Sequence, residues 1–243
     1  MKYMGSKSRI ADSIIPFIQK LIDDNKINTY IEPFCGGCNV IDKIKCQKKI
    51  ATDNHKYLIA MFQNLDKISS LPEFITKEHY SDVRDCFNKN SKKYEDWYIG
   101  AVGFLASYNG WFFDGGYAGL VETKIGTIRN YYDEAKRNLL EQILYLDDVE
   151  FHCCDYHVFS NCKGHLFYLD PPYKNKKQYG SSKNFNHNDF WDWCRDVSKN
   201  NIVIISEQEA PDDFKCVWQQ EVKRTIDNNK RVNVVEKLFM YNN

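Results

Sequence analysis

The sequence predicts an α/β fold, and three features of the chain indicate this class. Short apolar stretches typical of strands alternate with amphipathic helical stretches near both ends of the chain. Gly36 and Gly37 form a tight turn directly after the first strand-like stretch. A second strand-like stretch then ends in the acidic residue Asp53. Strand, glycine turn, helix and a strand with a terminal acid make up the nucleotide-binding half of a doubly wound sheet.

The first 65 residues supply this half of the sheet. Apolar residues recur at helical spacing from Ile10 onwards, so we predict a helix over residues 7–22. Residues 29–33 are a predicted strand, and the glycine turn then opens a helix that runs to Ile44, with Asn39 placed to cap it. The strand ending at Asp53 follows, and the next helix runs to Leu65.

Between about residue 66 and residue 146 the pattern changes. Polar and charged helical stretches appear, together with a segment rich in glycine and aromatic residues at 107–119. We interpret this region as an inserted helical module with a hairpin. The sequence therefore predicts a catalytic domain of residues 1–65 and 147–243, interrupted by an inserted module of residues 66–146.

The α/β pattern resumes after the insert and supplies the second half of the sheet. Two of its strands are apolar throughout, which is typical of strands buried on both faces. Two later stretches alternate apolar and polar residues and are predicted to close the sheet as an antiparallel pair. The predicted elements are strands at 149–154, 165–169 and 202–206, a helix at 188–198, and the antiparallel pair at 214–222 and 232–241.

Composition limits the classes of protein that the chain fits. Its 243 residues carry a formal net charge of zero, so any surface for nucleic acid must be a local patch. Nine cysteines, an odd number, and the lack of a secretion-type start favour reduced thiols in the cytoplasm. No apolar run is long enough to span a bilayer. Cys35 and Cys38 form one CxxC, but no second pair has zinc-finger spacing, so we expect no metal.

The glycine turn and Asp53 together suggest a nucleotide-type ligand. A glycine lets the backbone approach a ligand closely, and a carboxylate at the end of the next strand can accept hydrogen bonds from ribose hydroxyls. Asp53 follows Gly36 by 17 positions. The full dinucleotide fingerprint G-x-G-x-x-G is absent, so a pyrophosphate ligand is not indicated. An ordinary turn without a ligand would fit this motif equally well.

The sequence Asp170-Pro171-Pro172-Tyr173 is more specific. It follows an apolar strand, at the edge where open α/β sheets bind ligands. The prolines stiffen the backbone and remove two N–H donors, which leaves carbonyl acceptors. The Asp170 carboxylate and the Pro171 carbonyl could accept both hydrogens of an amino group, and Tyr173 could stack on the base that carries it. A surface turn is the alternative, but it would need neither the preceding strand nor the upstream glycine turn.

In these motifs and their order, the chain resembles the Dam-like DNA adenine methyltransferases, the alpha group of amino methyltransferases. The resemblance spans nearly the whole chain, although the inserted module matches poorly and Cys38 stands where the family turn often has its last glycine. The matching segments are residues 3–7, 32–36, Asp53 and Asn54, residues 154–156, residues 170–173, Arg231 and residues 236–238.

The resemblance implies a Rossmann-like sheet that binds S-adenosylmethionine (SAM), releases S-adenosylhomocysteine (SAH) and methylates a flipped adenine in double-stranded DNA. It implies that Asp170 bridges the cofactor and the adenine, that Pro171 and Pro172 complete the catalytic motif, and that Tyr173 stacks on the base. The inserted module would select the DNA sequence. The cofactor contacts it implies are Tyr3, Lys7, Phe34, Gly36, Asp53, Asp155 and Asp170.

Contacts with the DNA backbone need positive charge, and side chains that read bases need a suitable shape. Four lysines follow the catalytic motif directly, and as a group they are candidates for phosphate contact. Asn109 and Arg129 in the insert are candidates for base contact. The DNA-binding residues we predict are Asn109, Arg129, Lys174, Lys177, Lys183 and Arg231, with Lys176 in the same loop.

Other functions remain open at this point. A related enzyme could methylate a cytosine, an RNA guanine or a protein glutamine, although such enzymes more often begin the motif with Ser or Asn than with Asp170. An inactive DNA-binding relative and a dinucleotide oxidoreductase fit less well. We expect a monomer. If the Asp170 carboxylate were packed away in a salt bridge, or if the corner at residues 170–173 lay far from any SAM-sized cleft, amine binding there would be excluded.

Overall fold

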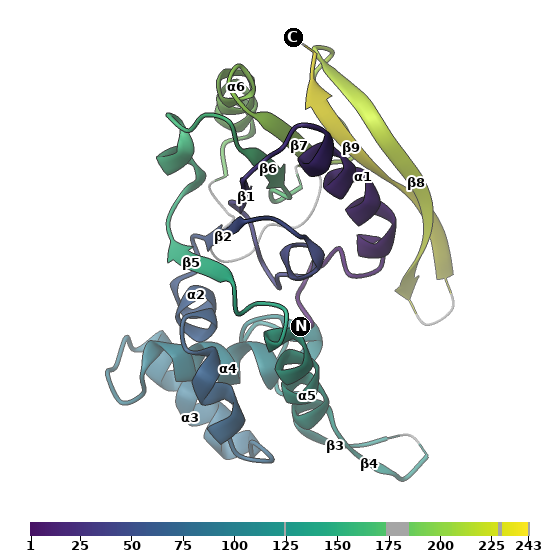
Figure 1. Ribbon diagram of the computed structural model, residues 1–243. Coiled ribbons are helices and arrows are strands. Elements are labelled where there is room, and N and C mark those ends of the chain that lie inside the picture. Colours follow the sequence, from purple (N-terminus) through teal and green to yellow (C-terminus); the bar gives the residue numbers. More distant parts are fainter. Residues whose placement is uncertain (124, 174–184, 228–229, 243) are drawn as a thin grey trace.

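The structure is a computed structural model that describes residues 1–123, 125–173, 185–227 and 230–242. The side chains of residues 223–232 lie outside this description. The centre of the molecule is a seven-stranded sheet of order β5-β2-β1-β6-β7-β9-β8 (Figure 1). The first five strands in this order are parallel to one another, and β9 is antiparallel to both of its neighbours, β7 and β8. Its strands are β1 (Thr29–Glu32), β2 (Lys48–Asp53), β5 (Val149–Cys153), β6 (Leu166–Leu169), β7 (Ile202–Ser206), β8 (Phe214–Asp227) and β9 (Lys230–Tyr241).

The two faces of the sheet are covered by different helices. Alternate residues of a strand point to opposite faces. Tyr30 and Leu166 share a buried cluster with Ile14 of α1 (Ala11–Asp24). Their neighbours Ile31 and Phe167 instead belong to a cluster with Phe190 of α6 (His187–Ser198). The sheet is therefore the middle layer of three, as expected for an α/β fold.

A helical region lies below the sheet in Figure 1 and includes most of the predicted insert. Helix α2 (Lys56–Phe62) leads from the sheet into it, and α3 (Lys77–Asn88), α4 (Asp96–Leu105) and α5 (Tyr131–Ile143) follow. At Gly100 a Cβ would come 2.0 Å from the carbonyl oxygen of Tyr57, so α4 approaches α2 this closely only with glycine. Buried residues of these helices belong to the same cluster as α1, so the core is continuous from one region to the other.

A short hairpin projects from the helical region. It pairs β3 (Leu120–Glu122) with β4 (Ile128–Asn130) in antiparallel register. Asn130 then starts α5, because its side chain accepts a hydrogen bond from the backbone N–H of Asp133 at 3.1 Å. The hairpin therefore continues directly into α5.

The predicted elements agree with the structure at most places and are wrong at one. The strands and the closing antiparallel pair are confirmed, and the first helix begins at Ala11 instead of Lys7. The helix expected after the glycine turn is absent: residues 33–40 are irregular, and only a 3₁₀ turn forms, at Ile41–Lys43. Cys38 has a left-handed φ of 56°, which no residue of an α-helix adopts. Asn39 does not cap a helix, and its amide donates instead to the Met1 carbonyl.

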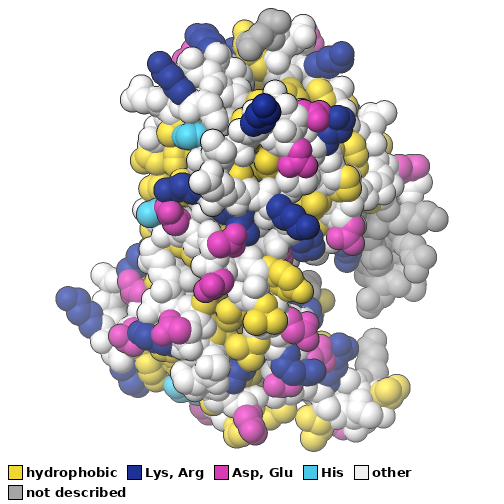
Figure 2. Space-filling view, viewed as in Figure 1, with side chains coloured by type: hydrophobic (Ala, Val, Ile, Leu, Met, Phe, Trp, Pro, Cys, Tyr) yellow, Lys and Arg dark blue, Asp and Glu magenta, His cyan; other side chains and the backbone are white. Residues whose placement is uncertain are grey.

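The distribution of charged side chains on the surface agrees with the formal net charge of zero. Figure 2 shows acidic and basic side chains intermixed on the visible face. Among the helices that the structure describes, none combines the length and the apolar character needed to cross a membrane. Within the described ranges, no group of three or more His, Cys, Asp or Glu residues is arranged to hold a metal ion.

Candidate functional site

Three adjacent parallel strands bring the predicted site residues to one edge of the sheet. Strand β1 lies between β2 and β6, with Glu32 beside Ala51 and Ile31 beside Phe167. The glycine turn follows β1, Asp53 ends β2, and Asp170 follows β6 directly. Since the carboxyl ends of parallel strands meet at one edge, segments far apart in sequence converge there.

The glycine turn and Asp53 are in direct contact. The backbone N–H of Gly36 donates to Asp53 Oδ2 at 3.2 Å, and the N–H of His55 donates to Asp53 Oδ1 at 2.9 Å. Burial raises the pKa of Asp53, and these backbone hydrogen bonds oppose that shift. The acid that we predicted as a ribose ligand is thus fixed against the turn that precedes it by 17 residues.

Gly36 is required by its backbone and by its neighbour. Its φ is +45°, and a Cβ at this position would lie 2.7 Å from the ring of Tyr3. The Tyr3 ring therefore packs on the turn, and it also lies 5.8 Å from the ring of Phe104. Phe34, on the preceding part of the turn, packs its ring 5.4 Å from that of Tyr156. Two of the predicted cofactor residues are therefore aromatic rings held at the turn.

Lys7 joins the catalytic motif from the other end of the sequence. Its Nζ lies 2.7 Å from Asp170 Oδ1 and 2.6 Å from the hydroxyl of Tyr173, and 4.5 Å from the centre of the Tyr173 ring. Burial acts to lower the pKa of Lys7, but Asp170 and Tyr173 raise it above its ordinary value. The three side chains thus form one charged, hydrogen-bonded group.

The ion pair does not pack the Asp170 carboxylate away. The Lys7 side chain is 6% exposed, while that of Asp170 remains 19% exposed. The partner is itself a predicted site residue, and Asp170 lies at the sheet edge that holds the glycine turn. A salt bridge is therefore present, but it leaves the Asp170 carboxylate partly exposed, so the condition that would have excluded amine binding is not met.

Two residues to which the sequence analysis gave no role lie within hydrogen-bonding distance of the Tyr173 hydroxyl. It lies 3.3 Å from Ser206 Oγ and 3.3 Å from Glu236 Oε2. Ser206 ends β7 and is fully buried, and Glu236 on β9 is 2% exposed. Burial raises the pKa of Tyr173, so the hydroxyl is neutral at ordinary pH and can donate. The ring is therefore oriented through its hydroxyl group.

Asp155 plays a local role. It precedes the 3₁₀ turn Tyr156–Phe159 and accepts a hydrogen bond from the N–H of His157 at 3.0 Å. Its side chain is 54% exposed, and its described partner is His157. The neighbouring ring of Tyr156 packs on Phe34, so the segment lies beside the turn. A cofactor contact by Asp155 stays a prediction.

The predicted DNA-binding residues fall into three groups. Asn109 is exposed in the 3₁₀ turn Tyr108–Gly110, and a Cβ on Gly110 would lie 2.3 Å from the Lys2 carbonyl, so this turn lies beside the segment that carries Tyr3. The Arg129 guanidinium on β4 makes two hydrogen bonds to the Glu134 carboxylate, and its Nη2 lies 2.8 Å from Oε2. The candidates outside the described residues are Lys174, Lys176, Lys177, Lys183 and the side chain of Arg231.

Three buried polar residues, to which the sequence analysis gave no role, carry a recognisable signal in the sequence. Glu236 shares a strand face with Leu238, so it is an acid at an apolar position of an alternating strand. Gln142 lies on the buried side of α5, three residues after Leu139. Burial raises the pKa of Glu32 at the end of β1 to about 8. Each is a polar residue in an apolar pattern.

An open, mostly parallel α/β sheet with a glycine turn, an acid at the next strand end and an Asp-Pro-Pro-Tyr corner is the architecture of a Rossmann-like methyltransferase. The chain belongs to the D12 class N6 adenine-specific DNA methyltransferase family, whose profile matches residues 3–203. It is therefore a SAM-dependent, site-specific DNA adenine methyltransferase.

Two curated relatives are similar over most of this chain. The Type II methyltransferase M.MjaIII of Methanocaldococcus jannaschii is 26% identical over 217 residues, which cover 79% of this chain and 74% of that one. The Type II methyltransferase M.FokI of Planomicrobium okeanokoites is 24% identical over 216 residues, which cover 80% of this chain but only 31% of that one. Both relatives are Type II methyltransferases by name.

Proposed function

We propose that Asp170, Pro171 and Tyr173 bind the target adenine, and that the turn at Gly36, together with Asp53, Tyr3, Lys7 and Phe34, binds SAM. The observation that carries this proposal is the convergence at one sheet edge of the Gly36–Asp53 contact and the Lys7–Asp170–Tyr173 group. Residues 66–146 would form the module that selects the DNA sequence.

The residues at the turn fit SAM by their chemistry. Asp53 is an acceptor for hydroxyl groups at a strand end, and Phe34 and Tyr3 offer aromatic faces beside it. When bound, SAM supplies a methyl group activated by a sulfonium. That chemistry requires close positioning of the amine more than it requires a strong base. No metal is part of the proposal.

The corner after β6 would position the amine. The Asp170 carboxylate and the Pro171 carbonyl accept the two hydrogens of the adenine amino group, which localises the nitrogen lone pair. Lys7 at 2.7 Å stabilises Asp170 in its charged form and fixes its orientation. Asp170 remains an ionised acceptor throughout, and the methylated nitrogen, which is cationic after transfer, loses its proton to solvent.

Tyr173 would receive the base once it has left the duplex. Base flipping costs a few kcal/mol, and stacking on an aromatic ring returns about 1–3 kcal/mol. Because its hydroxyl is already held by Lys7, Ser206 and Glu236, the ring loses little freedom when a base binds. A preformed platform of this kind favours the flipped state.

The rest of the proposal concerns DNA binding and cellular setting. The lysines of the loop at 174–183 would neutralise phosphates, and Asn109, Arg129 and Arg231 would contact the duplex. For Arg129 this requires exchange of its Glu134 partner for DNA. We also propose that the enzyme acts as a monomer in the cytoplasm.

The loop lysines are tested by replacing Lys174, Lys176, Lys177 and Lys183 together with glutamine. The slope of log affinity against log salt should become shallower by about 0.9 for each phosphate that is no longer neutralised. An unchanged slope would place the phosphate-binding residues elsewhere. The control set consists of four lysines exposed away from the motif, Lys20, Lys45, Lys163 and Lys199.

The proposed acceptor is tested by offering the purified protein several substrates. Duplex DNA, RNA and protein are incubated with SAM carrying a labelled methyl group, and the products are digested and separated by mass spectrometry. Label in N6-methyladenine from duplex DNA supports the proposed site. Label in methylcytosine, in RNA guanine or in protein glutamine would contradict the assignment of Asp170 and Pro171 to an adenine amine.

A further inference from the structure

Gln142 links the helical region to the cofactor turn. It lies near the end of α5 and is buried, with an exposed fraction of 6%. Its Nε2 lies 3.0 Å from the Gly37 carbonyl, 3.0 Å from the Cys38 carbonyl and 2.9 Å from Asp42 Oδ2. One side chain from the predicted insert therefore binds three acceptors in and after the turn, across 100 residues of sequence or more.

The carbonyls that Gln142 binds are those that a helix would have satisfied. In an α-helix opening at this turn, Gly37 and Cys38 would accept hydrogen bonds from the N–H groups four residues later. That helix does not form, and a buried carbonyl without a donor is costly. The Gln142 amide supplies the missing donors, so it stabilises the irregular turn.

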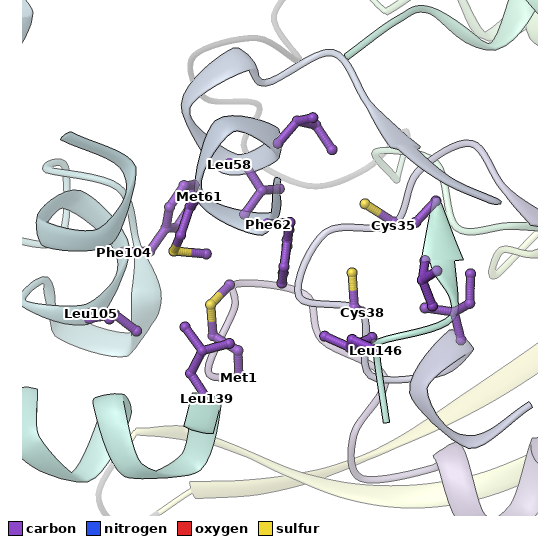
Figure 3. Packing of buried hydrophobic residues seen from close by; sticks show 14 of the residues in the cluster. Met1, Cys35, Cys38, Leu58, Met61, Phe62, Phe104, Leu105, Leu139 and Leu146 are labelled. Carbon is purple, nitrogen blue, oxygen red and sulfur yellow. The ribbon is translucent and has the colours of Figure 1, made fainter. Parts of the chain in front are cut away.

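Cys38 makes the turn depend on this support. It is a non-glycine residue with φ of +56°, a conformation in which a Cβ crowds the following carbonyl. Its side chain is fully buried in the cluster that also holds Leu139, one turn before Gln142 on α5, and Leu146 (Figure 3). The hydrogen bonds from Gln142 and this packing together hold Cys38 in the left-handed region. A glycine at this position would adopt the same conformation without that strain.

Gly36 lies two residues before Cys38 and donates its N–H to Asp53. The Cys38 N–H in turn donates to the Cys35 carbonyl at 2.8 Å, and the Cys35 N–H donates to the Thr52 carbonyl at 2.9 Å. A shift of the Cys38 carbonyl is therefore transmitted to the segment that positions Gly36 and Asp53. Because it acts through this segment, Gln142 need not touch the cofactor.

We infer that Gln142 is a positioning residue for the cofactor turn, through which α5 sets the conformation of residues 35–38. This inference rests on the proposed cofactor site. Since α5 begins directly after β4, the helix also connects the β3–β4 hairpin at one end to the cofactor turn at the other.

Affinity for SAH alone, measured by titration calorimetry, tests the inference without turnover. Gln142→Met keeps the volume but loses the Nε2 donors, and also the Oε1 acceptor of the hydrogen bond from the Met1 ammonium. It should weaken SAH binding about tenfold, the effect of one to two hydrogen bonds. Gln142→Glu places a carboxylate against three oxygen acceptors and should weaken it more. In kinetics, KM for SAM should rise while kcat changes little. Gln19→Met is the matched control, because Gln19 also bridges backbone groups, the N–H and carbonyl of Lys45.

The double variant Gln142→Met, Cys38→Gly separates positioning from general damage to the fold. Glycine relieves the left-handed strain, so SAH affinity should recover to within about threefold of Cys38→Gly alone. Unchanged SAH binding by Gln142→Met would overturn the inference. So would equal losses from Gln142→Met with Cys38 and with Gly at position 38. If the wild-type protein bound no SAH, the proposed cofactor site would fail, whereas wild-type binding with an insensitive Gln142 would overturn this inference alone.

Discussion

The corner after β6 and the β3–β4 hairpin are built in opposite ways. At the corner, Lys7, Asp170 and Tyr173 are largely buried, and Lys7 Nζ lies 2.7 Å from Asp170 and 2.6 Å from the Tyr173 hydroxyl. At the hairpin, Ile125 and Ile128 are 85% and 76% exposed, and the exposed Arg129 side chain pairs with the half-buried Glu134. Side chains fixed before substrate arrives suit the chemical step, which needs precise geometry. Exposed apolar and charged side chains suit a surface that adapts to its partner.

The largest effect that this comparison predicts is at Asp170. Asp170→Asn keeps an oxygen for Lys7 but loses the charge and one acceptor for the amine. We expect methyl transfer to fall by roughly a thousandfold, in the range seen when one transition-state interaction is removed. Single-turnover transfer to DNA measures it, with Asp212→Asn as an exposed control. Near-normal transfer with an unchanged unfolding temperature would mean that the corner is not the site of the reaction.

Two variants of Tyr173 separate the role of its ring from that of its hydroxyl group. Tyr173→Ala removes the stacking platform, so turnover should fall roughly tenfold to a hundredfold, the equivalent of the 1–3 kcal/mol of base stacking. Tyr173→Phe keeps the ring but removes the hydrogen bonds to Lys7, Ser206 and Glu236, so we expect a smaller loss of turnover and about 1 kcal/mol of stability. SAH affinity should fall less than turnover in both variants, because Tyr173 reaches the proposed cofactor residues only through Lys7. An equal loss of SAH affinity and turnover would show that Tyr173 serves the cofactor.

The buried Glu32, at the end of β1, should make the stability of the fold sensitive to pH. Its pKa is raised by burial to about 8, while an unfolded glutamate titrates near 4.5, so the folded state holds the extra proton between these values. Stability contributed by the protonated acid is therefore lost as pH rises from about 4.5 to 8. Glu32→Gln still accepts the hydrogen bond that the Tyr30 hydroxyl donates at 2.6 Å, and it should remove this loss. Urea unfolding of both proteins at several pH values measures the free energy of unfolding. If that free energy had the same pH dependence in both proteins, the raised pKa of Glu32 would be contradicted.

The smallest effect on stability should come from the hairpin. Ile128→Thr replaces an exposed side chain, so the free energy of unfolding should change by no more than about 0.5 kcal/mol. Leu139→Ala in α5, which is fully buried, should cost about 2–5 kcal/mol by contrast. If the hairpin contacts DNA, Ile128→Thr should alter duplex affinity despite its small effect on folding. A loss of stability comparable to that of Leu139→Ala would contradict the description of Ile128 as an exposed side chain.

The sequence predicted the strands because their patterns are local. Residues 202–206 are apolar throughout, and the closing pair alternates, so period and length were sufficient. The helix after the glycine turn was predicted wrongly because its absence depends on distant residues. The side chain of Gln142 donates hydrogen bonds to the carbonyls of Gly37 and Cys38, and no local sequence pattern indicates this contact.

The candidate site shows the same division. The motif at 170–173 and the spacing of Gly36 and Asp53 could be recognised in the sequence. The residues concerned lie where the carboxyl ends of the strands converge. The anchoring of Tyr173 by Ser206 and Glu236 was not predicted, because it joins strands that are paired only in the folded sheet. A buried acid within an apolar alternation, as at Glu236, was the available signal.

The central claim is that the corner after β6 receives the extruded base. Once modified-base sequencing has given the recognition site, a duplex carrying 5-iodouracil in place of the target adenine can be irradiated with the protein and SAH, and the attached peptide identified by mass spectrometry. The account predicts that the attachment maps to Tyr173, and that Tyr173→Ala abolishes it. Attachment to the β3–β4 hairpin or to Tyr108 instead, with Tyr173 unmodified, would contradict it.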